Sequence, residues 1–332
     1  MKRREFIAGA FSVAATTRVP AQPVPKARRL AIFSLSESSA LMVERSENRY
    51  YRALLTELRR LGHVVGENLT VERYGRENNT ADPAALVREV VRSQPDVIYV
   101  VGFGTSLFKR ETTTIPIVGL TGDPVAAGLI QSLARPGGNI TGASVDTGPS
   151  IHGKRIALLR ETFPPLAKLA YLTLRVQWDA IQGVGVRAAS EMTGVPVASL
   201  LLELPTSNVA YRAAILGASN EGANAIYVGD GPDVLANRAL IVDLIAQTRL
   251  PAIHPFRELA EIGGLMAYSF DLVELNKRVA NNIDAILRGK NPGEIPYWLA
   301  AKFELSINLK TATALRLAVP PSLLAIADNV IE

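Results

Sequence analysis

The sequence repeats one short pattern in its two halves, and this repeat limits what the chain can fold into. Residues 96–102 read D-V-I-Y-V-V-G and are followed by a helical stretch and the run I-P-I at 115–117. Residues 224–229 read N-A-I-Y-V-G and are followed by a helical stretch and the run L-P-A-I at 250–253. Short runs of Val and Ile between amphipathic stretches are typical of parallel strands buried between layers of helices. A chain of 332 residues has room for about two domains, so we predict two copies of one α/β architecture.

Strand and helix patterns alternate along the whole chain. Tyr51, Leu54 and Leu58 recur at helical spacing and predict a helix that ends at Gly62. Asp82-Pro83 is a typical cap and first turn of the next helix. Strands are predicted at residues 30–34, 69–74, 97–101, 115–119, 140–144, 169–174, 197–202, 225–229 and 252–254. Further helices are predicted at about 178–192, 211–216, 240–245 and 272–287.

The segment between two of these strands contains strong helix start and stop residues. Asp123 can cap a helix that begins at Pro124 and runs through Leu133. The sequence R-P-G-G-N at 135–139 would end that helix, because proline cannot continue it and glycine permits positive φ. We expect the chain to cross three times between two lobes, at residues 119–142, 265–268 and 303–309.

The same segment carries a resemblance to a known protein family. G-D-P-V at 122–125 and G-L-I-Q-S-L-A-R-P-G-G-N-I-T-G at 128–142 resemble segments of the solute-binding subunits of ABC transporters, in the family that includes tryptophan- and tyrosine-type binding proteins. The resemblance covers essentially the whole chain. Its other segments are T-T-I-P-I-V at 113–118, K-R-I-A-L-L-R-E at 154–161, G-G-L-M-A-Y at 263–268, K-F-E-L-S-I-N-L-K at 302–310 and V-P-P-S-L-L at 319–324.

This resemblance implies the type I periplasmic binding protein fold, in which two Rossmann-like lobes with parallel sheets are joined by a three-crossing hinge. Residues 28–142 with 269–300 would form the first lobe, and residues 143–268 with 301–332 the second. Such a protein would close on a small polar organic solute without chemistry and without a cofactor. The resemblance implies an ABC permease and its ATPase as partners, and suggests an amino acid, aromatic ones included, as the solute.

The first residues have the composition of a bacterial export signal. Lys2, Arg3 and Arg4 precede a short apolar run at 7–15, and the small residue Ala21 precedes the predicted cleavage site. We expect residues 1–21 to be removed after export to the periplasm by the twin-arginine route. The apolar run is too short to anchor the mature chain in a bilayer. Because the sequence has no cysteine, a lipid-modified N-terminal cysteine and disulfides are excluded.

The charge of the chain gives no reason to expect nucleic-acid binding. The net charge is +5, but residues 1–21 hold four of the 36 Lys and Arg residues and one of the 31 Asp and Glu residues, which leaves +2 on the remainder. A nearly neutral protein lacks the basic surface that binds a phosphate backbone.

Two glycine-containing segments fall short of a nucleotide-binding pattern. G-F-G-T-S-L at 102–107 has Leu107 where a dinucleotide fingerprint has its third glycine. The segment 148–155 has Arg155 where a Walker A loop needs Ser or Thr to bind magnesium, and it is better explained as the start of a helix. We therefore predict neither nicotinamide binding nor ATP hydrolysis.

Motifs of metal and nucleophilic catalysis are absent from the sequence. The three histidines are His63, His152 and His254, and their spacing matches no common metal site. There is no G-x-S-x-G elbow and no cysteine nucleophile. We predict a protein that is not an enzyme. Two alternatives stay open: an exported α/β enzyme whose catalytic residues converge from distant positions, and a sugar-repressor-like sensor without a DNA-binding unit.

Candidate binding residues follow the predicted strands, because open parallel sheets bind ligands at the carboxyl ends of their strands. In the first lobe they are Ser34, Ser36, Phe103, Gly104, Thr105, Thr121 and Asp123, and in the second Gln177, Trp178, Gly229, Asp230, Phe256, Arg257 and Tyr268. The turn at 102–105 would offer backbone N–H groups to a ligand carboxylate, and Asp123 or Asp230 would pair with its amine. Asp123 could instead be only a cap, and Trp178 only a core residue. We expect alanine at either acid to weaken binding and leave the fold intact.

Overall fold

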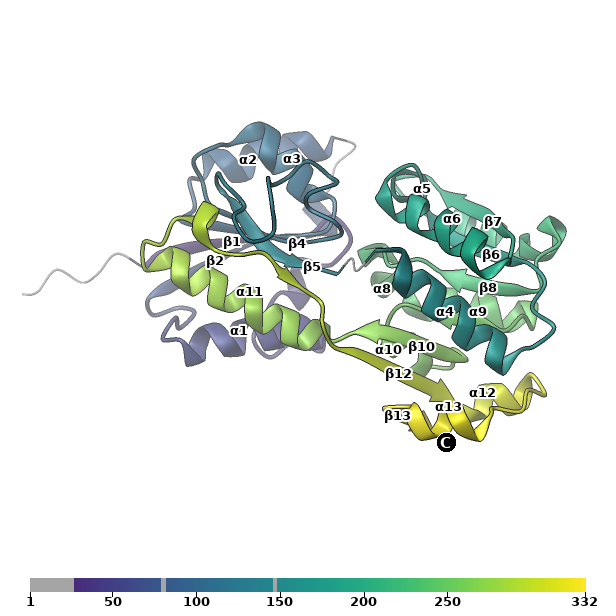
Figure 1. The fold of residues 1–332 in the computed structure, drawn as a ribbon. Coiled ribbons are helices and arrows are strands. Elements are labelled where there is room, and N and C mark those ends of the chain that lie inside the picture. Colours follow the sequence, from purple (N-terminus) through teal and green to yellow (C-terminus); the bar gives the residue numbers. More distant parts are fainter. Residues whose placement is uncertain (1–26, 79–81, 146–147) are drawn as a thin grey trace, which may run out of the picture.

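The chain forms two lobes, each built on its own sheet (Figure 1). This computed structural model describes residues 27–78, 82–145 and 148–332, so the predicted export signal lies outside the described residues. The first lobe has a six-stranded sheet in the order β11-β5-β4-β3-β1-β2. The second has a seven-stranded sheet in the order β13-β12-β10-β9-β8-β6-β7. All strand pairs are parallel except β10 with β12.

The first lobe takes most of its elements from the N-terminal half of the chain. They are β1 Arg28–Phe33, η1 Ser39–Leu41, α1 Arg49–Arg60, β2 Leu69–Tyr74, η2 Arg76–Asn78, α2 Pro83–Arg92, β3 Val97–Val101, α3 Gly104–Glu111, β4 Ile117–Thr121 and β5 Ile140–Ser144. Later parts of the chain add α11 Leu272–Leu287, η4 Pro292–Glu294 and β11 Trp298–Leu299.

The second lobe contains the repeat of this architecture and the C-terminus. Its first elements are α4 Pro149–Thr162, β6 Leu169–Leu174, α5 Arg175–Trp178, α6 Ile181–Thr193, β7 Val197–Leu202, α7 Asn208–Leu216, η3 Ala218–Glu221, β8 Ala225–Val228, α8 Pro232–Ala236 and α9 Arg238–Thr248. They are followed by β9 Ala252–His254, α10 Arg257–Glu261, β10 Met266–Phe270, β12 Phe303–Asn308, α12 Leu309–Ala314, α13 Pro321–Ile326 and β13 Asn329–Ile331.

Each central strand is apolar on both faces because helices cover both sides of its sheet. In β1, Leu30 and Ile32 pack in the cluster that contains Leu54 of α1, whereas Ala31 and Phe33 pack in the cluster that contains Val87 of α2. Successive side chains of a strand point to opposite faces, so an unbroken apolar run is what a doubly covered strand requires. The second lobe follows the same rule, with α4 and α6 on one face of its sheet and α7 and α9 on the other.

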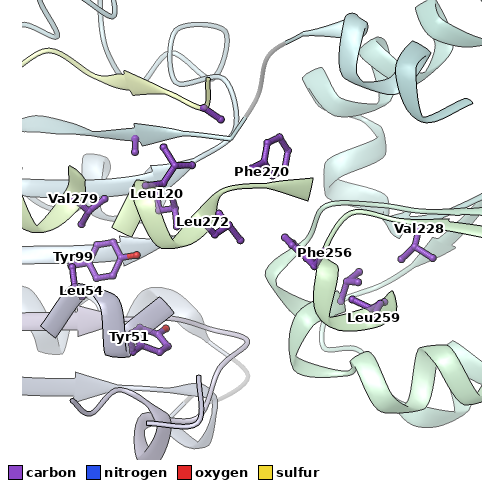
Figure 2. Packing of buried hydrophobic residues seen from close by; sticks show 14 of the residues in the cluster. Tyr51, Leu54, Tyr99, Leu120, Val228, Phe256, Leu259, Phe270, Leu272 and Val279 are labelled. Atoms are coloured by element: carbon purple, nitrogen blue, oxygen red, sulfur yellow. The ribbon is translucent and has the colours of Figure 1, made fainter. Parts of the chain in front are cut away.

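One apolar cluster continues from the first lobe into the second (Figure 2). Tyr99 and Val279 belong to the first lobe, and Val228 and Phe256 to the second. Phe270, the last residue of β10, lies between these groups. The two lobes are therefore in direct contact in this structure.

Three connections join the lobes, and two of them are hydrogen-bonded to each other. The first connects β5 to α4, and its residues 146–147 are outside the described residues. The second passes from β10 to α11 at Asp271, and the third passes from β11 to β12 through Lys302. The backbone N–H of Asp271 donates to the carbonyl of Lys302 at 3.1 Å, and the Lys302 ammonium contacts the Asp271 carboxylate at 3.1 Å.

All three connections lie outside the segments in which the sequence predicts them. Residues 119–142 stay in the first lobe, where β4 and β5 are neighbours. Gly142 has φ +155°, and a Cβ there would lie 1.9 Å from the Gly119 carbonyl oxygen, which explains a glycine at this close approach. Residues 266–270 and 303–308 are antiparallel neighbours inside the second sheet.

The helix predicted from Pro124 to Leu133 is absent, and a hydrogen-bonded turn takes its place. The Asp123 carboxylate accepts hydrogen bonds from the N–H groups of Val125 and Ala126, both at 2.9 Å, as a helix cap would. Gly128 then adopts φ +65° and ends the turn. A single cap with a glycine five residues later does not sustain a helix.

Candidate ligand-binding site

The carboxyl ends of the strands of both lobes meet where the lobes touch. Gly102 follows β3 of the first lobe, and Pro232 begins α8, after β8 of the second. A Cβ at Gly102 would lie 3.0 Å from Cγ of Pro232. The loop after β3, which contains Gly102, and the loop after β8, which contains Gly229, therefore face each other. The topology of open parallel sheets predicts a ligand site at such a place.

A second contact between the lobes is electrostatic. Arg49, at the start of α1, contacts Glu258 at 3.1 Å and Glu261 at 2.6 Å, and both acids belong to α10. The Tyr50 hydroxyl donates to Glu258 at 2.5 Å. Burial and the Glu258 carboxylate raise the pKa of Tyr50 well above its ordinary value, so this hydroxyl stays a donor.

Three of the four hydroxyl candidates of the first lobe form hydrogen bonds within their own lobe. The buried Ser34 hydroxyl accepts from the N–H of Glu37 at 3.2 Å, and Thr105 donates to the Gly102 carbonyl at 3.1 Å. The Thr121 hydroxyl lies 2.9 Å from that of Tyr297. Ser36 is partly exposed, close to the start of η1. These bonds fix the shape of the loops after β1, β3 and β4.

The turn after β3 combines a buried glycine with an exposed ring. A Cβ at Gly104 would lie 2.8 Å from the Phe33 ring, so the backbone at this point lies directly on the core. Phe103 is 50% exposed, unlike most large apolar side chains of the protein. Helix α3 begins at Gly104, which places the positive end of a helix dipole at this turn.

Asp230 of the second lobe is paired with a buried arginine. The Arg155 guanidinium donates to Asp230 through Nη1 at 2.6 Å, to the Tyr227 hydroxyl at 3.1 Å, and through Nε to the Tyr268 carbonyl at 2.9 Å. The Arg155 side chain is 0% exposed and that of Asp230 7%. Burial would lower the pKa of Arg155, but the Asp230 carboxylate raises it above its ordinary value. Arg155 therefore remains charged inside the lobe.

Glycines on both sides of Asp230 permit close backbone approach. A Cβ at Gly229 would lie 2.9 Å from the Leu172 carbonyl oxygen and 3.0 Å from the Tyr171 hydroxyl. A Cβ at Gly231 would lie 2.1 Å from Oδ1 of Asp233. Neither position can hold a larger residue without movement of the loop, so the glycines fix where Asp230 lies.

Two candidates after β6 have structural contacts. Gln177 accepts a hydrogen bond from the Thr173 hydroxyl at 3.0 Å. The Trp178 ring lies 5.9 Å from that of Tyr171, and the Arg187 guanidinium lies over it at 4.9 Å. Trp178 is partly buried and packs against the core of the second lobe.

The last three candidates lie near the connections between the lobes. Phe256 is buried in the apolar cluster that both lobes share. Arg257 pairs with Glu261 at 2.7 Å, on the same helix that Arg49 contacts. The Tyr268 ring stacks on that of Phe303, with 5.5 Å between centroids. Two of the candidates, Asp230 and Tyr268, are joined by Arg155, which donates hydrogen bonds to both.

Arg155 is the residue of this cluster that sequence reasoning missed. It lies in the K-R-I-A-L-L-R-E segment, where basic residues on a predicted helix are usually exposed to solvent. His152, one turn earlier on α4, also contacts the Tyr227 hydroxyl, with Nδ1 at 2.5 Å. Two polar side chains at i and i+3 mark one helix face, but the sequence does not show which partner they meet.

Among the described residues, His, Asp and Glu side chains form no group of three or more that could hold a metal ion. A search of the same part of the chain finds no helix long and apolar enough to cross a membrane.

Comparison with known proteins identifies the family. The family model for ABC transporter substrate binding proteins matches residues 45–331. The tyrosine-binding protein of Clostridioides difficile is 22% identical over 301 residues, which cover 87% of this chain and 81% of that protein.

Solved structures agree on the fold. A conserved domain protein from Vibrio cholerae superposes with a TM-score of 0.80 at 22% identity, over 92% of this chain and 100% of that one. The ABC domain in complex with L-Trp from Streptococcus pneumonia superposes with a TM-score of 0.79 at 20% identity, again over 92% and 100%. The two-lobed α/β architecture is that of type I periplasmic binding proteins. With a family model that spans most of its length, this chain belongs to the ABC transporter substrate-binding proteins.

Proposed function

We propose that this protein is the periplasmic solute-binding component of an ABC importer, and that it binds an amino acid between its lobes. The observation that carries the proposal is Asp230, an acid at the carboxyl end of a strand, held by a buried arginine where the lobes meet. The relatives named for tyrosine binding and solved with L-Trp make aromatic amino acids the first solutes to test.

Asp230 supplies the group that an amine needs. Its Oδ1 accepts from Arg155, and no hydrogen bond to its other carboxylate oxygen occurs among the described residues. A carboxylate has about four acceptor positions, so Asp230 can bind Arg155 and a ligand ammonium at the same time. A charge-assisted bond of this kind is about twice as strong as a neutral one.

The turn after β3 supplies the matching groups in the first lobe. The start of α3 at Gly104 suits the carboxylate of an amino acid, because backbone N–H groups and the helix dipole favour an anion there. The exposed Phe103 ring offers an apolar wall for the side chain. Solute contacts with both lobes would favour the closed form over the open one, and the closed form would dock on a permease with its ATPase.

The proposed location can be checked on the chain itself. We expect the mature protein to begin near Gln22 and to occur in the periplasm, with Arg3 and Arg4 required for export. Intact-mass analysis of periplasmic extract should give a chain without residues 1–21, and Arg3→Lys/Arg4→Lys should leave the precursor in the cytoplasm. A cytoplasmic protein that retains these residues would contradict this route.

Thermal unfolding tests the proposed solute class. A ligand at a hundred times its Kd stabilises the native state by about 2.7 kcal/mol, so L-tyrosine or L-tryptophan should raise the Tm by several degrees. Tyramine lacks the carboxylate and 3-(4-hydroxyphenyl)propionate lacks the amine, and both should give much smaller shifts. A shift with sugars, or with the two analogues as large as with the amino acids, would contradict the proposal.

A further inference from the structure

Arg155 contacts both a candidate binding residue and the backbone of a strand that leads to the other lobe. Its helix α4 follows the first connection between the lobes. Its Nη1 holds Asp230 at 2.6 Å, and its Nε holds the carbonyl of Tyr268, on the strand that leads into the second connection. One guanidinium therefore joins the candidate acid to the backbone of β10.

Aromatic contacts extend this link to the third connection. The Arg155 guanidinium lies 5.4 Å from the centroid of the Phe270 ring, and Phe270 precedes Asp271, where the chain enters the first lobe. The Phe270 and Phe303 rings are 5.9 Å apart, and Phe303 is the first residue of β12, after the third connection. These contacts join the Arg155 side chain to residues beside the second and third connections.

Stability alone does not account for this arginine. A buried ion pair often contributes no more than apolar side chains of the same volume would. The Nη2 group of Arg155 is also buried without a hydrogen-bond partner among the described residues, which costs further stability. A planar guanidinium does offer several donors in fixed directions, so it can hold a carboxylate and a carbonyl in a fixed relation to each other.

We propose that Arg155 is the positioning residue of the solute site: it orients the Asp230 carboxylate toward the solute and couples that carboxylate to β10 at the connection between the lobes. The part of this inference that concerns the solute rests on the proposed function. Solute binding to Asp230 then favours the closed arrangement of the lobes, because Arg155 holds both Asp230 and β10, the strand that leads into the second connection.

Hydrogen exchange tests the coupling without any ligand. Arg155→Lys keeps the charge and loses the fork, so amide exchange should become at least about tenfold faster at residues 229–233 and at 266–271 together. Arg160→Met is the matched control on the same helix, since Arg160 donates to the Thr193 carbonyl away from the site. The control should leave both segments unchanged. Faster exchange in neither segment, or in one of them only, would overturn the coupling.

A second variant keeps this test decisive if Arg155→Lys does not fold. Arg155→Met/Asp230→Asn removes both charges at once, which buried pairs tolerate better than the loss of one partner. It still lacks the bond to the Tyr268 carbonyl, so exchange at 266–271 should rise at least about tenfold relative to the parent. An unchanged rate at 266–271 would overturn the coupling equally.

Calorimetric titration with L-tyrosine tests the positioning role. Arg155→Lys should weaken L-tyrosine binding at least tenfold in the parent, but less than threefold in an Asp230→Asn background, because Arg155 acts through that acid. Equal losses in both backgrounds would overturn the positioning role. If the parent binds neither L-tyrosine nor L-tryptophan, the proposed solute is wrong, and hydrogen exchange still decides whether Arg155 couples the two segments.

Discussion

Replacing Asp230 by alanine is expected to weaken both solute binding and the fold. The variant leaves the Arg155 guanidinium, which is 0% exposed, without its counter-charge. Loss of one partner of a buried ion pair costs about 3 to 5 kcal/mol of stability, and loss of a buried charge partner of the ligand costs about 2 to 5 kcal/mol of binding. The sequence alone predicts an intact fold, whereas the ion pair with Arg155 leads us to expect a destabilised one.

Urea unfolding and calorimetry on the same preparations separate the two effects. Asp230→Asn keeps the shape and one acceptor oxygen, so it should lose less stability than Asp230→Ala while it still binds the amino acid weakly. Asp123→Ala is the comparison, because loss of its two bonds to the turn should cost about 1 kcal/mol of stability. If Asp230→Ala binds an identified amino acid as tightly as the parent, Asp230 is structural and the site lies elsewhere.

Acid should destabilise the protein through His254. The side chain is 0% exposed, and neither ring nitrogen has a hydrogen-bond partner among the described residues. Burial lowers the pKa of His254 to about 3, whereas an unfolded histidine titrates near pH 6.5. Below pH 6.5 the unfolded chain therefore binds a proton that the folded chain does not, so stability falls with pH until the folded pKa is reached. Between pH 6.5 and pH 4 we expect a loss of roughly 3 kcal/mol from this residue.

The variant His254→Asn removes this titration and retains a polar side chain of similar reach. Urea unfolding of the parent should show the loss between pH 7.5 and pH 4, and the variant should lose roughly 3 kcal/mol less over the same interval. His152 will contribute to the remaining loss, because burial lowers its pKa to about 4. An identical pH dependence in parent and variant would contradict the role of His254.

The strands and most helices could be predicted because their residue patterns are local. Strands β2, β3, β6 and β7 begin and end where the sequence indicates, as does α11. The apolar runs of β3 and β6 follow from burial between two layers of helices, and a short window of sequence records this. The turn after Asp123 was not predicted, because an Asp cap followed by proline also begins helices, and here the chain leaves the helical conformation at Gly128, where φ is +65°.

The candidate site was partly predictable for a related reason. Topology places Asp230 after a strand, and the two glycines beside it indicate close backbone approach. The Arg155 side chain points inward because it contacts Asp230, which lies 75 positions later in the chain. A local sequence pattern does not reveal such a contact. An arginine on a helix is normally exposed, so no sequence pattern indicates that this one is buried.

The proposed function requires an amino acid to bind between the lobes with its amine on Asp230. The most direct measurement is a crystal structure of the mature protein with the amino acid that gives the largest thermal shift. We expect the ligand ammonium within hydrogen-bond distance of the Asp230 carboxylate, and its carboxylate at the turn between β3 and α3. A ligand on the outer face of one lobe, or one in the cleft with its amine away from Asp230, would contradict the claim.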